Sequence, residues 1–235
     1  MSHEIRTPMN AIIGFSNLLI DPEVRNNLKE EMVHYVTQNA NALMKLIDDI
    51  ITISKIEANQ TELNIRKTDI SKILTELIDE FEDLKEIMNK QHLAFIIDYE
   101  INQNILSVYT DPNHLKKILY NLLDNAFKFT EEGEIHFGYK MENSTIIFYV
   151  KDSGIGLSNK DQENVFNRFT KAAYSKKKIY RGAGLGLSIC KSLVELLGGE
   201  ISVESISEEN GNQNGSTFFV KISSKAQDNE NEPIK

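Results

Sequence analysis

A heptad repeat of apolar residues constrains the first quarter of the chain more than any other feature of the sequence. Between residues 32 and 53 the repeat advances by alternating steps of four and three residues, through Met32, Val36, Asn39, Leu43, Leu46, Ile50 and Ile53. Helices that pack side by side in coiled-coil-like bundles have this period. The pattern predicts one helix from about Val24 to about Ala58, with Ile47, Ile51 and Ser54 widening its buried face.

A shorter helix precedes this long one. Ile5, Ile12 and Leu19 recur every seven residues, and the Asp21–Pro22 step ends the helix because proline disfavours helical conformation in the residue before it. The two helices predict a hairpin with one apolar face. Since that face is too small to stand alone, we expect two copies to pair into a four-helix bundle. Packing of the hairpin on the rest of its own chain is the alternative.

The rest of the chain mixes the two periodicities. Strand-like segments are 63–66, 92–100, 134–139, 145–150, 200–204 and 216–222. Helical segments are 70–88, 112–129 and 185–197. Helices and antiparallel strands in this order predict an α+β fold, with the helical hairpin followed by an α/β sandwich. We expect the hairpin to cover 1–60, the sandwich 61–225, and a polar tail 226–235.

Charge and composition exclude several classes of protein. Asp and Glu number 35 against 26 Lys and Arg, for a net charge of −9, so the chain lacks the basic footprint of a nucleic-acid binder. The single cysteine, Cys190, cannot form an internal disulfide, which favours a reducing, cytoplasmic setting. The chain has no apolar run of the roughly 18 residues that a membrane span needs, so we expect no membrane contact by this fragment.

Two glycine clusters lie about thirty residues apart in the second half of the chain. Residues 152–156 follow a predicted strand, and residues 182–187 open a predicted helix. Glycine lets the backbone approach a ligand closely, and a helix N-terminus presents unpaired N–H groups to phosphate. Either cluster alone also fits an ordinary turn. Neither is a P-loop, because no Gly-Lys-Ser/Thr follows.

A polar face on an otherwise apolar helix precedes the glycines. Asn121, Asn125 and Lys128 stand at i, i+4 and i+7 and therefore share one side of the helix. Two carboxamides and an ammonium in a row suit a hydrated Mg²⁺ and the phosphates that it bridges. A solvated helix face is the alternative for this segment by itself. Together with both glycine clusters, the pattern favours a nucleotide site.

With these segments in this order, the chain resembles the catalytic core of a sensor histidine kinase from two-component signalling. The ATP-binding domain of that family has the Bergerat fold, which is shared with gyrase, Hsp90 and MutL. The resemblance runs from Ser2–Pro8, which match the family's H box, to the closing strand near Ile222. It implies a homodimer joined through the hairpin, a mixed and mostly antiparallel sheet, and ATP and Mg²⁺ as ligands.

For the H box, the resemblance implies that His3 is the phosphoacceptor. Glu4 matches the acid that orients the imidazole and takes its proton, and Thr7 matches the residue that positions a water for dephosphorylation of the partner. His3 precedes Ile5 by two residues and so lies off the apolar stripe, where it is expected to be exposed. The implied reaction passes the phosphoryl group from ATP to His3 and then to an aspartate of a separate response-regulator receiver domain.

For the nucleotide site, the resemblance implies a role for each residue of the polar helix face. Asn125 matches the Mg²⁺ ligand with Asn121 beside it, Lys128 reaches phosphate, and Phe129 lines the pocket. Asp152 matches the acid that accepts a hydrogen bond from the adenine amino group. The residues implied to approach the base or to cradle the phosphates are Gly154, Gly156, Gly182, Gly184, Leu185, Gly186 and Leu187.

Residues 164–171 match the F box, which anchors a lid that would span 172–181 and close over the phosphates. Lys171 stands where the family often has arginine. Lysine keeps the charge but loses the bidentate fork, so Arg168 and Arg181 are further candidates for the phosphate contact.

Two other functions compete with the kinase. A Bergerat-fold ATPase would have a glutamate in place of Asn121 and would lack the H box. A dimeric signalling scaffold with a degenerate nucleotide site would not need the intact Asn125 and Asp152. Only Met1 and Ser2 precede His3, so we expect a fragment of a longer receptor, with a frayed first helix and weakened dimerisation. Membrane anchoring of a full-length parent stays open.

Overall fold

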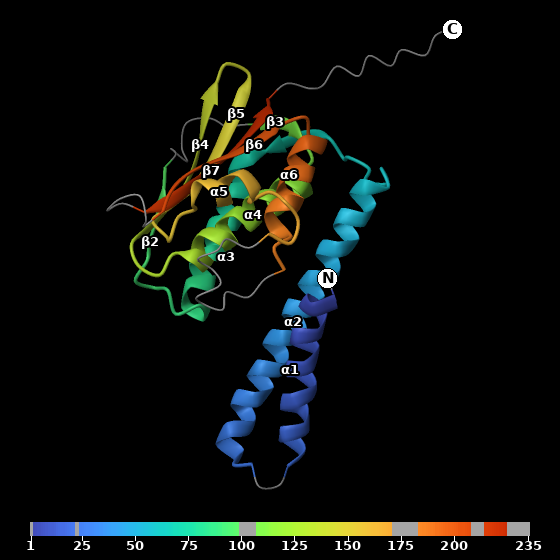
Figure 1. Ribbon diagram of the computed structural model, residues 1–235. Helices are drawn as coiled ribbons and strands as arrows, with labels where there is room; N and C mark the ends of the chain where they lie inside the picture. Colours follow the sequence, from blue (N-terminus) through green and yellow to red (C-terminus); the bar gives the residue numbers. More distant parts are fainter. Residues whose placement is uncertain (1, 22–23, 99–106, 171–182, 208–213, 225–235) are drawn as a thin grey trace.

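The computed structural model describes residues 2–21, 24–98, 107–170, 183–207 and 214–224. A long helical hairpin carries a layered α/β domain at one end (Figure 1). The hairpin consists of α1 (Ser2–Ile20) and α2 (Asn26–Glu57), in agreement with the two predicted helices. The Phe15 and Tyr35 rings stack across it with 5.0 Å between their centroids.

The C-terminal domain is built on a five-stranded sheet in the order β2-β4-β5-β7-β6. Its strands are β2 (Ala94–Ile97), β4 (Glu134–Glu142), β5 (Thr145–Asp152), β7 (Gly215–Ser223) and β6 (Glu200–Ile206). Only β2 pairs in parallel, with β4, and the other three pairings are antiparallel. The predicted mixed, mostly antiparallel sheet is confirmed.

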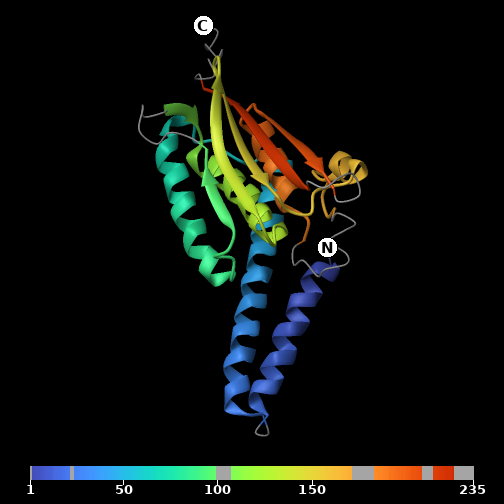
Figure 2. The same ribbon diagram turned by 90° about the vertical axis from the view of Figure 1, so that its left-hand side faces the viewer.

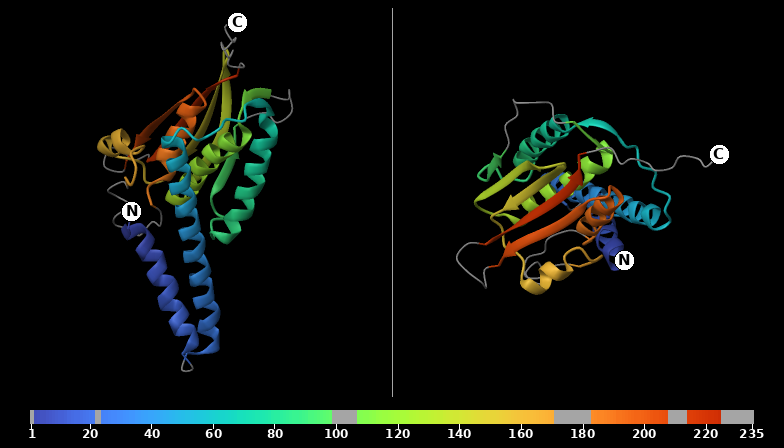
Figure 3. Two further views of the ribbon diagram at one scale, coloured as in Figure 1. Left: turned by 90° about the vertical axis from the view of Figure 1, so that its right-hand side faces the viewer. Right: turned by 90° about the horizontal axis from the view of Figure 1, so that it is seen from above.

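Three helices cover one face of this sheet (Figures 2 and 3). They are α3 (Ile70–Ile87), α4 (Pro112–Phe129) and α6 (Gly186–Leu196). A two-stranded antiparallel sheet of β1 (Arg66–Asp69) and β3 (Ser107–Thr110) lies apart, and the short α5 (Asn159–Asn164) contacts β6. The α+β sandwich predicted from the sequence is therefore present.

The core lies between the sheet and the three helices. Its largest fully buried side chains are Phe81, Phe127, Phe137 and Phe148. Phe127 stacks on Phe81 at 5.1 Å and meets Phe95 edge-on at 5.2 Å, so α4 is held between α3 and the sheet. Aromatic pairs at these distances add stability beyond the apolar area that they bury. The opposite side of α4 is left to carry polar residues.

Side chains from outside the helix fix both ends of α4. At its start the Asp111 carboxylate accepts hydrogen bonds from the backbone N–H groups of Asn113 and His114. At its end the Lys90 ammonium donates to the carbonyls of Phe127 and Thr130, at 2.5 and 2.6 Å. A cation at a helix C-terminus also complements the helix dipole. The position of α4 is thus set before any ligand binds.

The residues of the heptad repeat on α2 do not all pack against the same surface. Leu46 is buried, and Ile50, Ile53 and Ile56 pack against the core of the C-terminal domain, as the alternative to pairing between copies anticipated. Ile47 and Ile51, which were expected to widen the buried face, are 39% and 47% exposed in the single chain. Their burial would need a second copy, as in the predicted four-helix bundle.

Candidate active site

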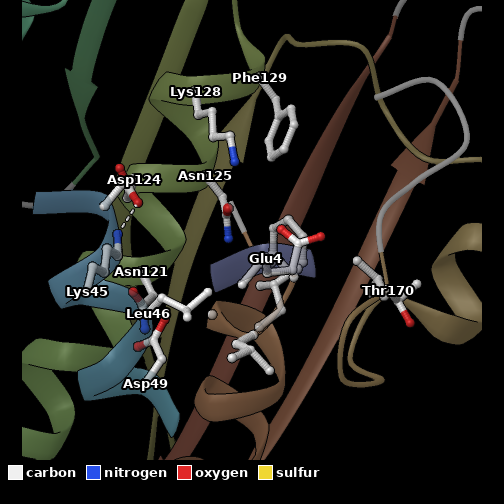
Figure 4. A pocket seen from close by; sticks show the side chains of 18 of the residues that line it. Glu4, Lys45, Leu46, Asp49, Asn121, Asp124, Asn125, Lys128, Phe129 and Thr170 are labelled. Atoms are coloured by element: carbon white, nitrogen blue, oxygen red, sulfur yellow. Dashed lines mark hydrogen bonds and ion pairs between the residues drawn. The ribbon is translucent and has the colours of Figure 1, made fainter. Parts of the chain in front are cut away.

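A cavity of about 490 Å³ lies between the hairpin and the C-terminal domain, and Figure 4 shows it from close by. Six helices and strands contribute to its lining: α1, α2, α4, the end of β5, the start of α6 and β7. Its volume falls in the range of small-molecule sites, about 300–1,000 Å³. Most of the residues singled out in the sequence meet at this one place.

The polar face of α4 forms one wall of the cavity. Asn121, Asn125 and Lys128 all line it, as their helical spacing predicts, and Asn121 is 6% exposed. The Lys128 ammonium lies over the Phe129 ring, 4.8 Å from its centroid. Phe129 lines the cavity as well, so a ligand here meets two carboxamides, a cation and an aromatic face.

Asp152 ends β5 and is 7% exposed. Burial raises the pKa of its carboxyl group from 3.8 to about 6, against the opposing effect of the backbone N–H groups of Gly154 and Ser216. The Gly154 N–H donates to Oδ1 at 2.9 Å. A carboxylate has about four acceptor positions, so Asp152 can still accept a hydrogen bond from a ligand amino group.

The glycines fit tightly against protein backbone. At Gly156 φ is +66°, and an added Cβ would lie 1.9 Å from the Ile206 carbonyl oxygen. At Gly184 φ is +71°, and an added Cβ would lie 2.6 Å from the Thr170 carbonyl oxygen. Both glycines line the cavity, whereas Gly154 packs behind it against the Phe129 carbonyl. These glycines shape the wall of the cavity through contacts with neighbouring backbone.

The N-terminus of α6 opens into the cavity. Gly184, Leu185, Gly186 and Leu187 all line it, and the helix begins at Gly186. The first N–H groups of a helix have no partner within the helix, and together with its dipole they favour an anion. Gly182, Lys171 and the predicted lid 172–181 lie outside the described residues.

The hairpin supplies the remaining wall. From α1, Glu4, Thr7 and Pro8 line the cavity, so the H box and the polar face of α4 meet in one place. His3 is exposed and stands at the rim, one residue before Glu4. The Thr7 hydroxyl donates to the backbone carbonyl of His3 at 3.0 Å, a hydrogen bond that does not involve the His3 imidazole.

Sequence reasoning missed a cluster of charged residues on this wall. Lys45 Nζ lies 2.7 Å from Asp124 Oδ2 and 5.7 Å from the Tyr120 ring centroid. Burial by itself would lower the pKa of Lys45, but the Asp124 carboxylate outweighs it and the pKa is raised. Burial raises the pKa of Asp49, which lines the cavity one turn further along α2. Nothing local in the sequence pairs Lys45 with a residue on α4.

Arg168 is placed differently from the sequence expectation. Its guanidinium forms an ion pair with Glu57, at the C-terminal end of α2, and it lies outside the described lining of the cavity. A phosphate contact by Arg168 therefore stays a prediction that this arrangement does not support. The ion pair adds a second bond between the C-terminal domain and the hairpin.

The donor set fits a nucleotide with a divalent cation better than a cation alone. The part of the chain that the structure describes has no group of three or more His, Cys, Asp or Glu side chains able to hold a metal ion. An ion here would depend on the carboxamide oxygens of Asn121 and Asn125, on water and on ligand phosphates. Mg²⁺ is commonly held in that way, through few protein ligands and the phosphates of a substrate.

Two family models match the chain. Residues 1–59 match the His Kinase A (phospho-acceptor) domain, and residues 110–226 match the histidine kinase-, DNA gyrase B- and HSP90-like ATPase family. The curated relatives include the circadian input-output histidine kinase CikA of Synechococcus elongatus, 35% identical over 94% of this chain and 29% of the relative. They also include the autoinducer 2 sensor kinase/phosphatase LuxQ of Vibrio vulnificus, 36% identical over 94% of this chain and 25% of the relative.

A solved structure has a similar architecture over nearly all of the chain. The histidine kinase ThkA, crystallised in complex with the response regulator protein TrrA, is 26% identical with a TM-score of 0.66, over 95% of this chain and 59% of that one. The chain spans less than a third of the length of the curated relatives named above. No helix in the described ranges is long and apolar enough to cross a membrane.

Proposed function

The chain belongs to the sensor histidine kinases, as a catalytic core of that family, and on this premise we propose that it transfers the γ-phosphoryl group of ATP to His3. One observation carries the proposal. Glu4 and Thr7, which flank His3 on α1, line the same cavity as Asn125 and Asp152. An acceptor helix and a nucleotide wall that share one cavity suit phosphoryl transfer, which depends mainly on positioning and charge stabilisation.

In this proposal a different part of the cavity lining contacts each part of the nucleotide. The Asp152 carboxylate accepts a hydrogen bond from the adenine amino group, and a buried acceptor of this kind discriminates against bases that lack a donor there. The phosphates lie at the N-terminus of α6, with Lys128 opposite. Asn125 would hold Mg²⁺ with Asn121 beside it, and the bound ion would supply neutralisation of phosphate charge.

The transfer itself uses groups of the H box. An imidazole nitrogen of His3 forms a bond to the γ-phosphorus while the bond to the bridging oxygen breaks, and ADP leaves with that electron pair. Glu4 takes the displaced imidazole proton and passes it to water. We propose that the phosphoryl group then moves to an aspartate of a response-regulator receiver domain. Thr7, one helical turn from His3, positions a water that attacks the receiver's aspartyl phosphate, which releases inorganic phosphate and restores the carboxylate.

What supports the receiver as partner is the ThkA relative, whose structure contains a response regulator. The LuxQ relative carries both kinase and phosphatase in its name, which supports the second activity. These two likenesses extend over 94% and 95% of this chain, and residues 1–59, which contain His3, match the phospho-acceptor family model.

We propose that a second copy covers an apolar stripe on the hairpin. Several of the hairpin's large side chains that are 39–58% exposed lie along this stripe, at Met9, Ile13, Val33, Met44, Ile47 and Ile51. A stripe of this length is costly to leave in water and suits a four-helix bundle formed by two hairpins.

Labelling with ATP tests the function directly. With radiolabelled ATP and Mg²⁺, the chain is expected to acquire a phosphate that is stable in base and labile in acid. The His3→Gln variant should acquire none, whereas the matched control His34→Gln, an exposed histidine on α2, should label normally. Label that survives in His3→Gln, or that resists acid as a phosphoserine does, would overturn the proposal.

A further inference from the structure

We infer that His3 receives its phosphoryl group from the nucleotide bound in its own chain, not from that of a partner copy. The inference rests on the kinase function proposed above and adds which of two chains supplies the nucleotide. Its first support is the lining of the cavity, which takes Glu4, Thr7 and Pro8 from the same chain as Asn125 and Asp152.

The geometry of α1 places His3 at the edge of that lining. Successive residues of a helix are about 100° apart, so Glu4, Thr7 and Pro8 share one face of α1, and His3 is displaced by about 40° from Thr7. The His3 side chain is exposed at this rim. The face of α1 that borders His3 therefore already stands against the nucleotide wall of its own chain.

The second support is the way the C-terminal domain is held beside its own hairpin. Lys45 on α2 forms an ion pair with Asp124 at 2.7 Å, and Asp124 is the residue before Asn125. Leu46, the residue after Lys45, is 7% exposed. The Arg168–Glu57 ion pair fixes the domain at a second point near the end of α2. These contacts keep the nucleotide wall against α1 of the same chain (Figures 3 and 4).

The third support is the position of the apolar stripe. On a helical projection of α2, the cavity residues Lys45, Leu46 and Asp49 centre on one direction, and Met44, Ile47 and Ile51 centre about 180° away. A second copy seated on the stripe therefore lies across α2 from the cavity. Dimerisation leaves the Glu4 side of the cavity in place and brings the partner to the far side of α2.

Heterodimers of differently tagged chains test the inference. In the first, one chain carries His3→Gln and the other Asn125→Ala. Transfer within a chain leaves both unlabelled, whereas transfer between chains labels the Asn125→Ala chain. In the second heterodimer, a wild-type chain is paired with a chain that carries both substitutions. Transfer within a chain labels the wild-type chain at close to its homodimer rate, and transfer between chains abolishes that label.

The two heterodimers give opposite results under the two mechanisms, so inactivity of a misfolded variant cannot imitate either pattern. Label on the Asn125→Ala chain, or loss of label from the wild-type chain in the second heterodimer, overturns the inference. A wild-type homodimer that fails to label, or that labels without His3, overturns the kinase function instead. If the chain is monomeric, the rate of labelling per chain is expected to stay constant on dilution, and a rate that falls in proportion to concentration contradicts the inference.

Discussion

Lys45 of the hairpin and Asp124 of the C-terminal domain, 79 residues apart in the sequence, meet with 2.7 Å between Nζ and Oδ2. Surface pairs of this kind contribute only about 0–1 kcal/mol to stability. This pair nevertheless joins the two bodies that form the cavity, and Asp124 neighbours the proposed Mg²⁺ ligand Asn125. Its principal effect is therefore expected on the alignment of the two bodies.

Reversing one charge of this pair is expected to slow labelling of His3. Lys45→Glu and Asp124→Lys each place like charges face to face, and misalignment of reacting groups is expected to lower the rate by about ten-fold or more. The double variant restores opposite charges and should recover most of the rate. Lys116→Glu is the matched control, because Lys116 pairs with Glu76 at 2.9 Å within the C-terminal domain. An unchanged rate in both single variants would contradict an aligning role.

Replacing Asp152 by Asn is expected to stabilise the ligand-free protein at neutral and alkaline pH. The pKa of Asp152 is raised from 3.8 to about 6, so the folded state binds a proton more tightly than the unfolded state. The cost of ionising this buried group is absent below pH 4, grows between pH 4 and 6, and is complete above pH 6. The cost is on the order of 3 kcal/mol, since a difference of one in pKa between the folded and unfolded states corresponds to about 1.4 kcal/mol.

Thermal melts of the Asp152→Asn variant between pH 4 and pH 8 measure this effect. The gain in melting temperature over wild type should grow with pH, while ATP binding falls sharply because the adenine acceptor is altered. Asp79→Asn, an exposed position on α3, should change neither quantity. A gain that is the same at every pH would show that ionisation of Asp152 is not its cause.

Removing the charge of Lys90 is expected to loosen the end of α4. Its ammonium donates to the carbonyls of Phe127 and Thr130, and hydrogen bonds to charged groups contribute about 1.5–3 kcal/mol. Lys90→Met should therefore lower the free energy of unfolding by about 2 kcal/mol and weaken ATP binding, because Lys128 and Phe129 lie on this turn.

Denaturant unfolding and calorimetry with ATP measure the two effects of Lys90→Met. Lys85→Met is the control: Lys85 lies in the last turn of α3, five residues before Lys90, and its ammonium pairs with Glu82 at 3.1 Å. An equal loss of ATP affinity in the control would argue against a specific role for the contact with α4.

Replacing His136 by Gln is expected to destabilise the protein in acid more than in alkali. Burial by itself would lower the pKa of His136, but Glu134 and Asp98, at 3.0 and 2.8 Å, outweigh it and the pKa is raised. The stabilisation is therefore complete below about pH 6.5, the value for an unfolded histidine, and is lost as pH rises through the higher folded value. The melting temperature should fall at pH 6 and change little at pH 9, with His34→Gln as control.

Much of the site follows from local pattern. The i, i+4, i+7 spacing of Asn121, Asn125 and Lys128 holds because α4 is a regular helix whose other side is apolar and buried. The predicted helix 112–129 agrees with α4, which Asp111 caps and Pro112 begins. Such features depend on neighbours within a few residues, so they can be predicted from the sequence alone.

Contacts between segments that are distant in the sequence could not be predicted. The predicted strand 63–66 lies instead at Arg66–Asp69, because the Asn64 N–H is taken by the Asp111 carboxylate and the pairing with β3 begins two residues later. β3 and α5 were missed because elements of four and six residues have too few periods to recognise. The Lys45–Asp124 pair depends on how two bodies dock, which no periodicity encodes.

The two opposed faces of α2 couple the cavity to the apolar stripe, because both belong to one rigid helix. Its cavity residues and its apolar stripe stand on opposite sides of one continuous helix of 32 residues. A turn of that helix by 40° sweeps side chains about 5 Å from its axis through roughly 3.5 Å, more than an ion pair can span without breaking. A rotation of α2 that changes the contacts of the apolar stripe therefore also breaks or re-forms the Lys45–Asp124 ion pair. Conversely, a change at that ion pair is transmitted to the contacts of the stripe.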